Sequence, residues 1–434
     1  MSDHLTPQAQ QLYNLLETEQ SLLLHLLSPK GKAAYFPKEG ILAQTAQAKN
    51  KKYNATIGVA LDDAKQPLYL SAIQQHIQLP PSDIYLYASS YGQPQLRTVW
   101  QQHIQTQNPS LHHSISLPII TAGLTHALSI IGHLFIDTDD IIITPDLYWG
   151  NYHLIFSQAH HAKFVTFPLF QDNKFNLTGF KQTLTQHPGK KIILLNFPNN
   201  PTGYTPTIEE AHAICEIIKQ DAQQNNHLLV ICDDAYFSFF YKQDTFKQSL
   251  FSLLANAHPN ILTVKIDGAS KELYAWGLRI AFLTYAGLQL SPATFEILEE
   301  KTAGSIRGNL SNASQLSQTL ILNALQNPQT PKDQQHHFQL LQQRYTTIQK
   351  VLQNSKYQKH FTQLPCNSGY FLCIQLKQAN AEPLRQLLLE KYDTGVIALK
   401  NLIRIAFSSI PEQDIPKIIE NIYNACEELE ENNL

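Results

Sequence analysis

The chain has 434 residues, a formal net charge of −3 and hydrophobic residues at 43% of positions, enough for a large buried core. No long lysine or arginine block is present, which argues against nucleic-acid and membrane-surface ligands. The five cysteines are scattered without metal-ligand spacing, and no apolar run approaches the roughly 20 residues that cross a bilayer. With no secretory signal at the start of the chain, we expect a cytoplasmic protein with no bound metal and no nucleic-acid or membrane partner.

In chain order, a helical arm is expected over about 7–27, followed by alternating strand and helix patterns between about 118 and 286. The strand candidates are continuous apolar runs, which are typical of strands covered on both faces. Residues 207–223, between two of these runs, carry one apolar stripe at helical spacing. The pattern predicts an α/β fold with a mostly parallel seven-stranded sheet. The predicted strands are 117–123, 140–146, 163–169, 190–197, 227–236, 260–267 and 278–286.

Beyond about residue 320, helical patterns mix with two strand-like segments, 368–376 and 401–409. No internal repeat and no Pro/Gly/Ser linker separates this part from the rest, so we expect one tightly coupled unit. The predicted division is an arm and the start of a small domain over 1–53, a large ligand-binding domain over 54–320, and a smaller α+β domain over 321–434.

Ligands of α/β sheets bind beyond the carboxyl ends of the strands. The residues that follow the predicted strands are almost all polar, aromatic or glycine, which is typical of a ligand site. They are Gly123, Leu124, Thr125, Tyr148, Trp149, Asn200, Asp233, Tyr236, Ser270 and Lys271.

Asp233 ends an apolar strand, where a carboxylate is costly to bury without a cation. A protonated ring nitrogen is one suitable cation. Tyr236 and Asn200 could then hydrogen-bond a phenolic oxygen on the ring, and Trp149 or Tyr148 could stack on its face.

A phosphate would be held by Thr125 with the backbone N–H groups that open the following helix, together with Ser270 and Arg279. Lys271 is then the amine that forms an imine with an aldehyde on the ring. This set of groups describes pyridoxal 5'-phosphate.

At these residues the sequence resembles the class I/II aminotransferases, the fold-type I pyridoxal-phosphate enzymes related to aspartate aminotransferase. NFPNNPTG is similar to the family's Asn-Pro-x-Gly turn, and DDAY to its Asp-x-Ala/Val-Tyr strand end. SKELYAWGLR is similar to the family's Ser-Lys with an arginine eight residues after the lysine. The likeness runs in order from about residue 54 to the end of the chain.

The resemblance adds residues outside the strand ends and implies a homodimer. Tyr87, five residues before Gly92, takes the place of a phosphate-binding tyrosine donated by the partner subunit. Gly58 would lie beside the substrate, and Arg404 would bind the substrate α-carboxylate. Arg307, in KTAGSIRGNLSN, takes the place of a partner-subunit arginine that grips the distal carboxylate of a dicarboxylic substrate.

Two departures from the family pattern bear on the site. Gly268 stands where the family often has a second phosphate-binding serine. One extra residue separates Pro145 from Trp149 relative to the aspartate-type pattern, which leaves open whether Trp149 or Tyr148 stacks on the ring.

The resemblance implies transfer of an amino group between an L-amino acid and a 2-oxo acid such as 2-oxoglutarate by ping-pong kinetics. Lys271, Asp233 and Tyr236 are the expected catalytic residues, and aspartate or glutamate the favoured donors. Arg307 could equally lie on the dimer surface, so aromatic or aliphatic donors are the alternative. A lyase on the same fold is a further alternative. A pyridoxal-binding regulator is disfavoured because the N-terminal arm has neither the length nor the basic charge of a DNA-binding domain.

Overall fold

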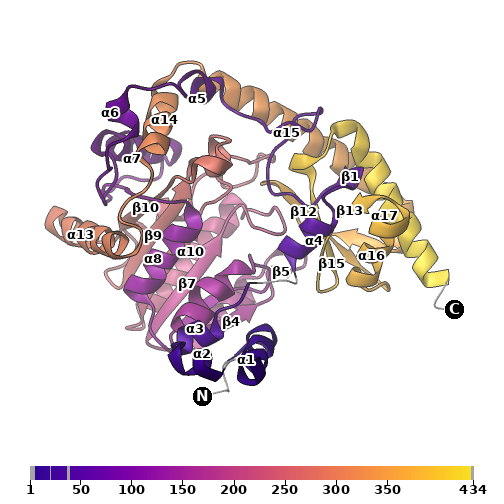
Figure 1. Cartoon of the computed structure of the whole chain (residues 1–434), viewed down its shortest axis with the longest axis horizontal. Coiled ribbons are helices and arrows are strands. Elements are labelled where there is room, and N and C mark those ends of the chain that lie inside the picture. The colour runs from indigo at the N-terminus through magenta and orange to yellow at the C-terminus, as the bar shows by residue number, and fades with distance from the viewer. Residues whose placement is uncertain (1–4, 20, 37–39, 432–434) are drawn as a thin grey trace.

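The computed structural model describes residues 5–19, 21–36 and 40–431. A large α/β domain and a C-terminal domain lie side by side, and the long helix α15 (Thr330–Leu352) runs along the edge of both (Figure 1). No helix in the described ranges is both long enough and apolar enough to span a bilayer.

The large domain is built on a seven-stranded sheet in the order β2-β10-β9-β8-β7-β3-β4. All neighbours are parallel except β10, which is antiparallel to both β2 and β9. Each of the seven predicted strands is present, which confirms the predicted fold class. The strands are β2 (Ile119–Thr121), β3 (Ile141–Pro145), β4 (Lys163–Phe167), β7 (Lys190–Asn196), β8 (His227–Asp233), β9 (Ile261–Gly268) and β10 (Ala281–Ala286).

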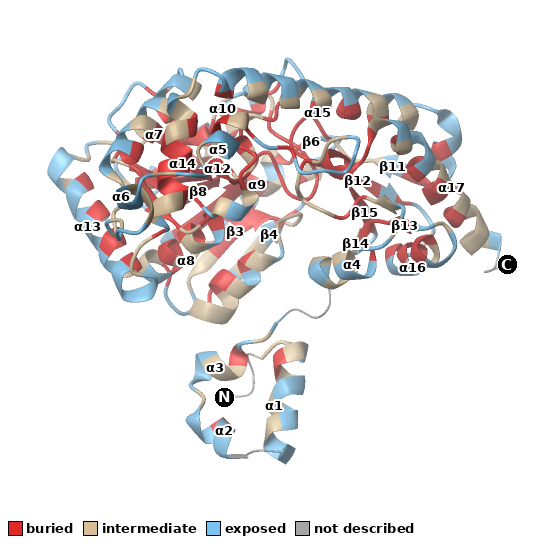
Figure 2. Cartoon of the chain, turned by 45° about the horizontal axis from the view of Figure 1, so that its top comes forward, coloured by how far each residue is buried: buried red, intermediate tan, exposed pale blue. Residues whose placement is uncertain are grey.

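Two hydrophobic cores lie on opposite faces of this sheet, because successive side chains of a strand point to opposite faces. In β7, Ile193 and Leu195 join one core, and Ile192 and Leu194 join the other. Burial on both faces explains the continuous apolar runs, and buried residues fill the centre of the domain in Figure 2. The first core packs against α7 (Pro94–Gln107), α9 (Leu177–Thr185) and α10 (Ile208–Ala222), and the second against α8 (Leu124–Phe135) and α13 (Pro292–Asn309).

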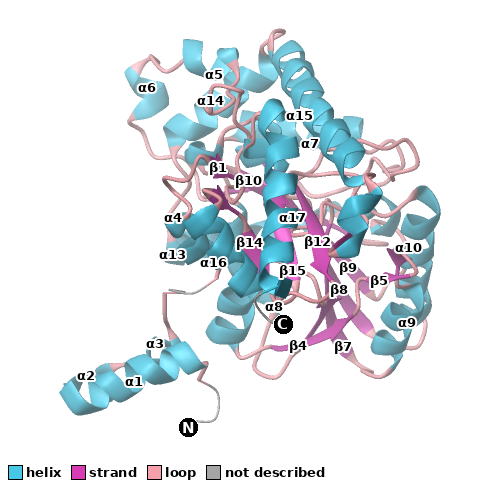
Figure 3. Cartoon of the chain, turned by 90° about the vertical axis from the view of Figure 1, so that its right-hand side faces the viewer, coloured by secondary structure: helices cyan, strands magenta, loops and turns pink. Residues whose placement is uncertain are grey.

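The C-terminal domain has a four-stranded antiparallel sheet in the order β11-β12-β15-β14. Helices α16 (Ala381–Lys391) and α17 (Ile415–Glu431) pack together on this domain (Figure 3). Residues 41–54 also belong to it, since β1 (Tyr53–Asn54) pairs with β13 (Thr394–Gly395). The sheet strands are β11 (Phe361–Gln363), β12 (Phe371–Leu376), β14 (Ile397–Leu399) and β15 (Leu402–Ala406).

Helix α14 (Gln315–Gln326) spans residue 320 and packs on α7, so the division at 53 and 320 stays a prediction. Helices α1 (Pro7–Glu19), α2 (Ser21–Leu26) and α3 (Pro29–Ala33) form a small lobe that projects from the large domain in Figures 2 and 3. They occupy the predicted arm, apart from residue 20, which lies outside the described residues. Short helices and strands complete the connections: α4 (Ile41–Gln47), α5 (Ser71–Gln75), α6 (Pro81–Ile84), β5 (Phe170–Gln171), β6 (Lys174–Phe175), α11 (Leu250–Leu254) and α12 (Ala269–Glu272).

Candidate active site

One cavity of about 250 Å³ lies where the parallel strands end. Strand pairing sets Asn196 of β7 beside Asp233 of β8, and Asp233 beside Ile266 of β9. Most of the predicted site residues line this cavity together, although they come from distant parts of the sequence. The lining residues are Gly58, Leu124, Thr125, Trp149, Tyr152, Asn196, Asn200, Asp233, Ala235, Tyr236, Lys271, Trp276 and Arg279.

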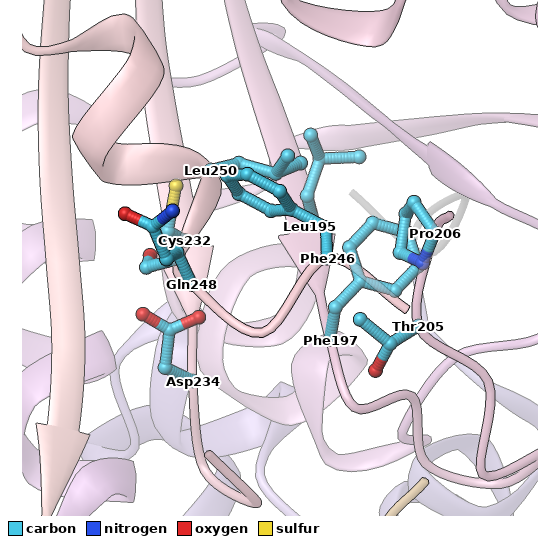
Figure 4. A pocket seen from close by; sticks show the side chains of 10 residues that line it. Leu195, Phe197, Thr205, Pro206, Cys232, Asp234, Phe246, Gln248 and Leu250 are labelled. Carbon is cyan, nitrogen blue, oxygen red and sulfur yellow. The ribbon is translucent and has the colours of Figure 1, made fainter. Parts of the chain in front are cut away.

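A second cavity is lined by Leu195 and Cys232, together with Asp234 and Phe246 (Figure 4). Its volume of about 10 Å³ is close to the minimum that admits a single water molecule. It is therefore too small for a substrate or a cofactor.

Asp233 is the last residue of β8 and is almost fully buried. Its Oδ2 accepts a hydrogen bond from the Tyr152 hydroxyl at 2.5 Å, and its Oδ1 accepts one from the Ala235 N–H at 3.1 Å. Burial raises the pKa of Asp233, while the Tyr152 hydrogen bond and the charge of Lys271 oppose that rise. A cation in the cavity would offset the cost of burying this carboxylate, which fits the predicted protonated ring nitrogen.

Lys271 lies in the short helix α12, which begins directly after β9. Its Nζ is 5.0 Å from the centre of the Tyr236 ring. Burial lowers the pKa of Lys271 to about 8; the charge of Asp233 opposes this change and that of Arg279 adds to it. A low pKa makes the neutral, nucleophilic amine accessible near physiological pH.

The start of helix α8 has the features of a phosphate site. Gly123 caps the helix with φ +89°, and a Cβ there would collide with the Arg279 guanidinium. Thr125 lies in the first turn, where backbone N–H groups are free to bind an anion. Ser270 Oγ is buried and has no hydrogen-bond partner among the described residues. These groups fit the phosphate of pyridoxal 5'-phosphate.

The prediction that Arg279 lies within a strand is wrong. β10 begins at Ala281, and Arg279 follows a 3-10 turn, Trp276–Leu278, with a left-handed φ of +54°. The turn places the guanidinium over the helix start rather than in the ladder of the sheet.

Arg404 is a second cation at the site, carried by β15 of the C-terminal domain. Its Nη1 donates to Asn200 Oδ1 and its Nη2 to the Thr56 carbonyl, both at 3.1 Å. The guanidinium carbon lies 4.3 Å from the centre of the Phe371 ring. It is only 2% exposed and forms no ion pair with a carboxylate in the described part of the chain. A guanidinium buried without a carboxylate partner is costly unless an anion completes it, which fits the predicted binding of the substrate α-carboxylate.

Five predicted residues do not line the cavity. Gly123, Ser270 and Arg404 adjoin or contact residues of its wall, whereas Tyr87 and Arg307 lie away from it. Tyr87 is 93% exposed, and Arg307 is exposed on α13, where its Nη1 donates to Ser311 Oγ at 2.8 Å. Neither lines the cavity of its own chain. Their roles stay predictions that require a second subunit.

The structure bears on both departures from the family pattern. Trp149 lines the cavity, whereas the Tyr148 hydroxyl bonds to His153 and its ring stacks at 5.5 Å on Phe164. A Cβ at Gly268 would stand 2.7 Å from the Ala281 Cα, so the close approach of β9 and β10 excludes any side chain there.

Four residues in the cavity wall were not predicted: Tyr152, Asn196, Ala235 and Trp276. Asn196 ends β7, so the strand-end rule could have identified it. Its Oδ1 accepts from the Asn200 N–H and its Nδ2 donates to the Asp233 carbonyl, both at 2.8 Å. Tyr152 follows the aromatic pair at 148–149 and Trp276 lies within SKELYAWGLR, but no local pattern shows that their side chains face the cavity.

The mostly parallel seven-stranded sheet, the smaller domain and the lysine-bearing cavity at the strand ends define a fold-type I transferase. The family model for aminotransferase class I and II matches residues 50–422. The chain therefore belongs to the class I and II aminotransferases, a pyridoxal-phosphate-dependent family, as the motifs predicted.

Among solved structures, an aminotransferase from Anaerococcus prevotii DSM 20548 is 26% identical with a TM-score of 0.78, covering 89% of this chain and 95% of that chain. Kynurenine aminotransferase from Pyrococcus horikoshii, 14% identical, shares the fold with a TM-score of 0.78 over 94% of this chain and 98% of its own.

Among curated relatives, an aspartate aminotransferase of Musicola paradisiaca is 28% identical over 38% of this chain and 39% of its own length. A probable aspartate/prephenate aminotransferase of Aquifex aeolicus is 26% identical over 56% of this chain and 57% of its own length. The matched segments thus span about two fifths to three fifths of these relatives.

Proposed function

We propose that this chain transfers an amino group between an L-amino acid and a 2-oxo acid such as 2-oxoglutarate, with ping-pong kinetics. One observation carries the proposal: Lys271, whose pKa is lowered, shares a cavity with the buried carboxylate Asp233, and the buried, unpaired Arg404 reaches the same site through Asn200. An amine, an anchor for a ring cation and an anchor for a carboxylate are the groups that this transfer requires.

Pyridoxal 5'-phosphate would be held by Asp233 at the ring nitrogen, by Trp149 against the ring face, and by Arg279 with the start of α8 at the phosphate. Bound there, the cofactor supplies an electron sink for the substrate carbanion. Tyr236 and Asn200 would donate hydrogen bonds to the phenolic oxygen.

The residues of the chain then perform the remaining tasks. Arg404 binds the substrate α-carboxylate and so orients the Cα–H bond. The Lys271 amine takes the proton from Cα and returns it elsewhere on the bound molecule, acting as base and then as acid. Gly58 would lie beside the substrate, since it is part of the cavity wall, and an added Cβ would stand 3.3 Å from the Phe371 ring and 3.7 Å from the Tyr236 hydroxyl.

For the substrate we propose a preference for aspartate and glutamate, with Arg307 of one subunit reaching the cavity of the other. The aspartate aminotransferases among the relatives support this. Arg307→Ala should raise KM for dicarboxylic substrates only. Equal losses for aspartate and for an aromatic substrate would instead favour the alternative, a preference for aromatic or aliphatic substrates. The two tryptophans in the cavity wall, Trp149 and Trp276, are compatible with that alternative.

The central test is Lys271→Ala. We expect the variant to fold, to lose turnover, and to show no borohydride-stable attachment of the cofactor, because Lys271 carries the only amine among the described residues that line the cavity. Attachment to a different lysine would contradict the assignment. Incubating the wild type with a panel of amino acids and 2-oxoglutarate, and measuring glutamate, pyruvate and ammonia, separates transfer from the lyase alternative.

A homodimer and a cytoplasmic location complete the proposal. The exposure of Tyr87 and Arg307 fits residues donated to a second subunit. All five cysteines are free and buried, which fits a reducing compartment.

A further inference from the structure

Tyr152 is a buried cavity residue to which the proposed mechanism gives no role. It is 1% exposed, and its hydroxyl donates to Asp233 Oδ2 at 2.5 Å. It caps the helical segment His153–Gln158, which begins after the aromatic turn at 148–149.

We propose that Tyr152 is a positioning residue that holds Asp233 charged and aimed at the ring nitrogen of the bound cofactor. The inference rests on the proposed function, since it assigns a role within the same site. Tyr152 acts through Asp233 and not on the substrate.

The hydrogen bonds around Asp233 support this role. Each carboxylate oxygen accepts one bond from the protein, from Tyr152 on one side and from the Ala235 N–H on the other. The Asn196 side chain holds the Asp233 carbonyl at 2.8 Å. The carboxylate is therefore restricted to one orientation, and two donors favour its charged form.

The Tyr152 hydroxyl remains a donor over the working pH range. Burial and the neighbouring Asp233 charge raise the pKa of the phenol well above its ordinary value. In its contact with the Asp233 carboxylate, the protonated Tyr152 hydroxyl can therefore act only as the hydrogen-bond donor.

The Tyr152 ring is held independently of its hydroxyl. It packs edge-on against Trp149, with centroids 5.6 Å apart and planes at 84°, and at 6.3 Å from Phe156. Tyr152→Phe should therefore keep the packing and remove only the hydrogen bond. The same ring links Trp149, proposed to cover the cofactor, to the carboxylate that would hold its nitrogen.

The experiment is a pH titration of the visible absorbance of Tyr152→Phe loaded with pyridoxal 5'-phosphate. With Asp233 less able to hold the ring proton, the ring withdraws fewer electrons, so the midpoint should rise by about one pH unit. Cofactor affinity, measured by equilibrium dialysis, should fall about tenfold, as for the loss of one charge-assisted hydrogen bond.

Tyr204→Phe is the matched control. The Tyr204 hydroxyl donates to Glu210 in another buried tyrosine–carboxylate pair, and Tyr204 does not line the cavity. Both variants should lose thermal stability, but only Tyr152→Phe should shift the titration. Equal titrations for Tyr152→Phe and the wild type would overturn the inference.

A double-mutant comparison gives a second test that tolerates a partly destabilised variant. If Tyr152 acts through Asp233, Tyr152→Phe should change neither the titration nor the affinity in an Asp233→Asn background. Additive effects would show that Tyr152 acts elsewhere. If the wild type forms no visible absorbance band with the cofactor, the proposed function is wrong. If the wild type forms the band but Tyr152→Phe does not shift its pH titration, only the inference about Tyr152 is wrong.

Discussion

The charged side chains Asp233 and Arg404 are buried, and neither forms a hydrogen bond with an oppositely charged side chain among the described residues. Asp233 has two neutral donors, while Arg404 has an amide and a carbonyl but no carboxylate among the described residues. Buried charges of this kind are costly unless a ligand completes them. The site is therefore complementary to a ligand that brings a cation to one end and a carboxylate to the other.

Arg404→Ala should raise KM for every amino acid and 2-oxo acid while the cofactor stays bound. Loss of a buried charge contact of this kind costs about 2–5 kcal/mol, which steady-state kinetics measures as a fall in kcat/KM. Arg385→Ala is the control, since Arg385 is equally buried but pairs with Glu382 on α16. If both variants kept normal KM values, Arg404 would be a structural residue.

The lowered pKa of Lys271 predicts a pH dependence of folding in the protein without cofactor. Between about pH 8 and 10.5 the unfolded chain keeps the proton that the folded chain has released. The unfolded state then binds more protons, so stability rises with pH in this window, with a slope of at most about 1.4 kcal/mol per pH unit.

Denaturant titrations of wild type and Lys271→Met across this range measure the effect. The stability difference between the two proteins should move in favour of the wild type as the pH rises. A constant difference would mean that Lys271 keeps an ordinary pKa in the folded protein.

The junction between β2 and α8 is the element on which the proposed phosphate site depends. Gly123 at the helix cap has φ +89°, so the chain reverses tightly and presents the first helical N–H groups to the cavity. Arg279 leaves the turn before β10 in a left-handed conformation and covers the same point. The placement of Gly123 and of Arg279 depends on positive φ angles in the turns beside the strands, and strand pairing does not determine those angles.

Gly123→Ala should weaken cofactor binding strongly, because its Cβ would displace the Arg279 guanidinium. Gly189→Ala is the matched control, since Gly189 has φ +94° but open space around its Cβ. Both changes strain the backbone by about 1 kcal/mol or more. Only Gly123→Ala should raise the dissociation constant of pyridoxal 5'-phosphate in a fluorescence titration, and similar affinities in the two variants would contradict a phosphate site at α8.

The candidate site draws on both domains, because Arg404 hydrogen-bonds to Asn200 of the cavity wall, and the proposed site extends to a second molecule. Residues of β7, β8 and α12 come from the large domain, and Arg404 comes from the small one. Tyr87 and Arg307 are exposed and do not line this cavity, so a single chain lacks two of the predicted contacts.

Mixing inactive Lys271→Ala chains with Tyr87→Phe chains, or with Arg307→Ala chains assayed on a dicarboxylic substrate, should give more activity than either variant alone. In such a hybrid, one of the two cavities would contain both an intact lysine and intact donated residues. Activity of the mixture, with mass measured by sedimentation, tests this. A fully active monomer would rule out the donated residues.

Local sequence determined the seven strands and several site residues. Continuous apolar runs form strands buried on both faces wherever they are placed, and the residue that ends such a strand must face the carboxyl edge. Asp233, Asn200 and Lys271 could therefore be assigned to this edge from the sequence, and the structure brings all three into one cavity wall. Gly58 and Arg404 were accessible only through the resemblance.

Tertiary structure alone decided which side chains meet across distant elements. The Tyr152 contact with Asp233 depends on how the segment after β3 packs against β8, and the lack of space at Gly268 depends on how closely β10 approaches β9. The turn that keeps Arg279 outside β10 is another feature that tertiary structure decided. Hydrophobic patterns record which face of an element is buried, but not which partner it meets. Contacts between elements arise only when the whole core packs, and for that reason these features are absent from the sequence pattern.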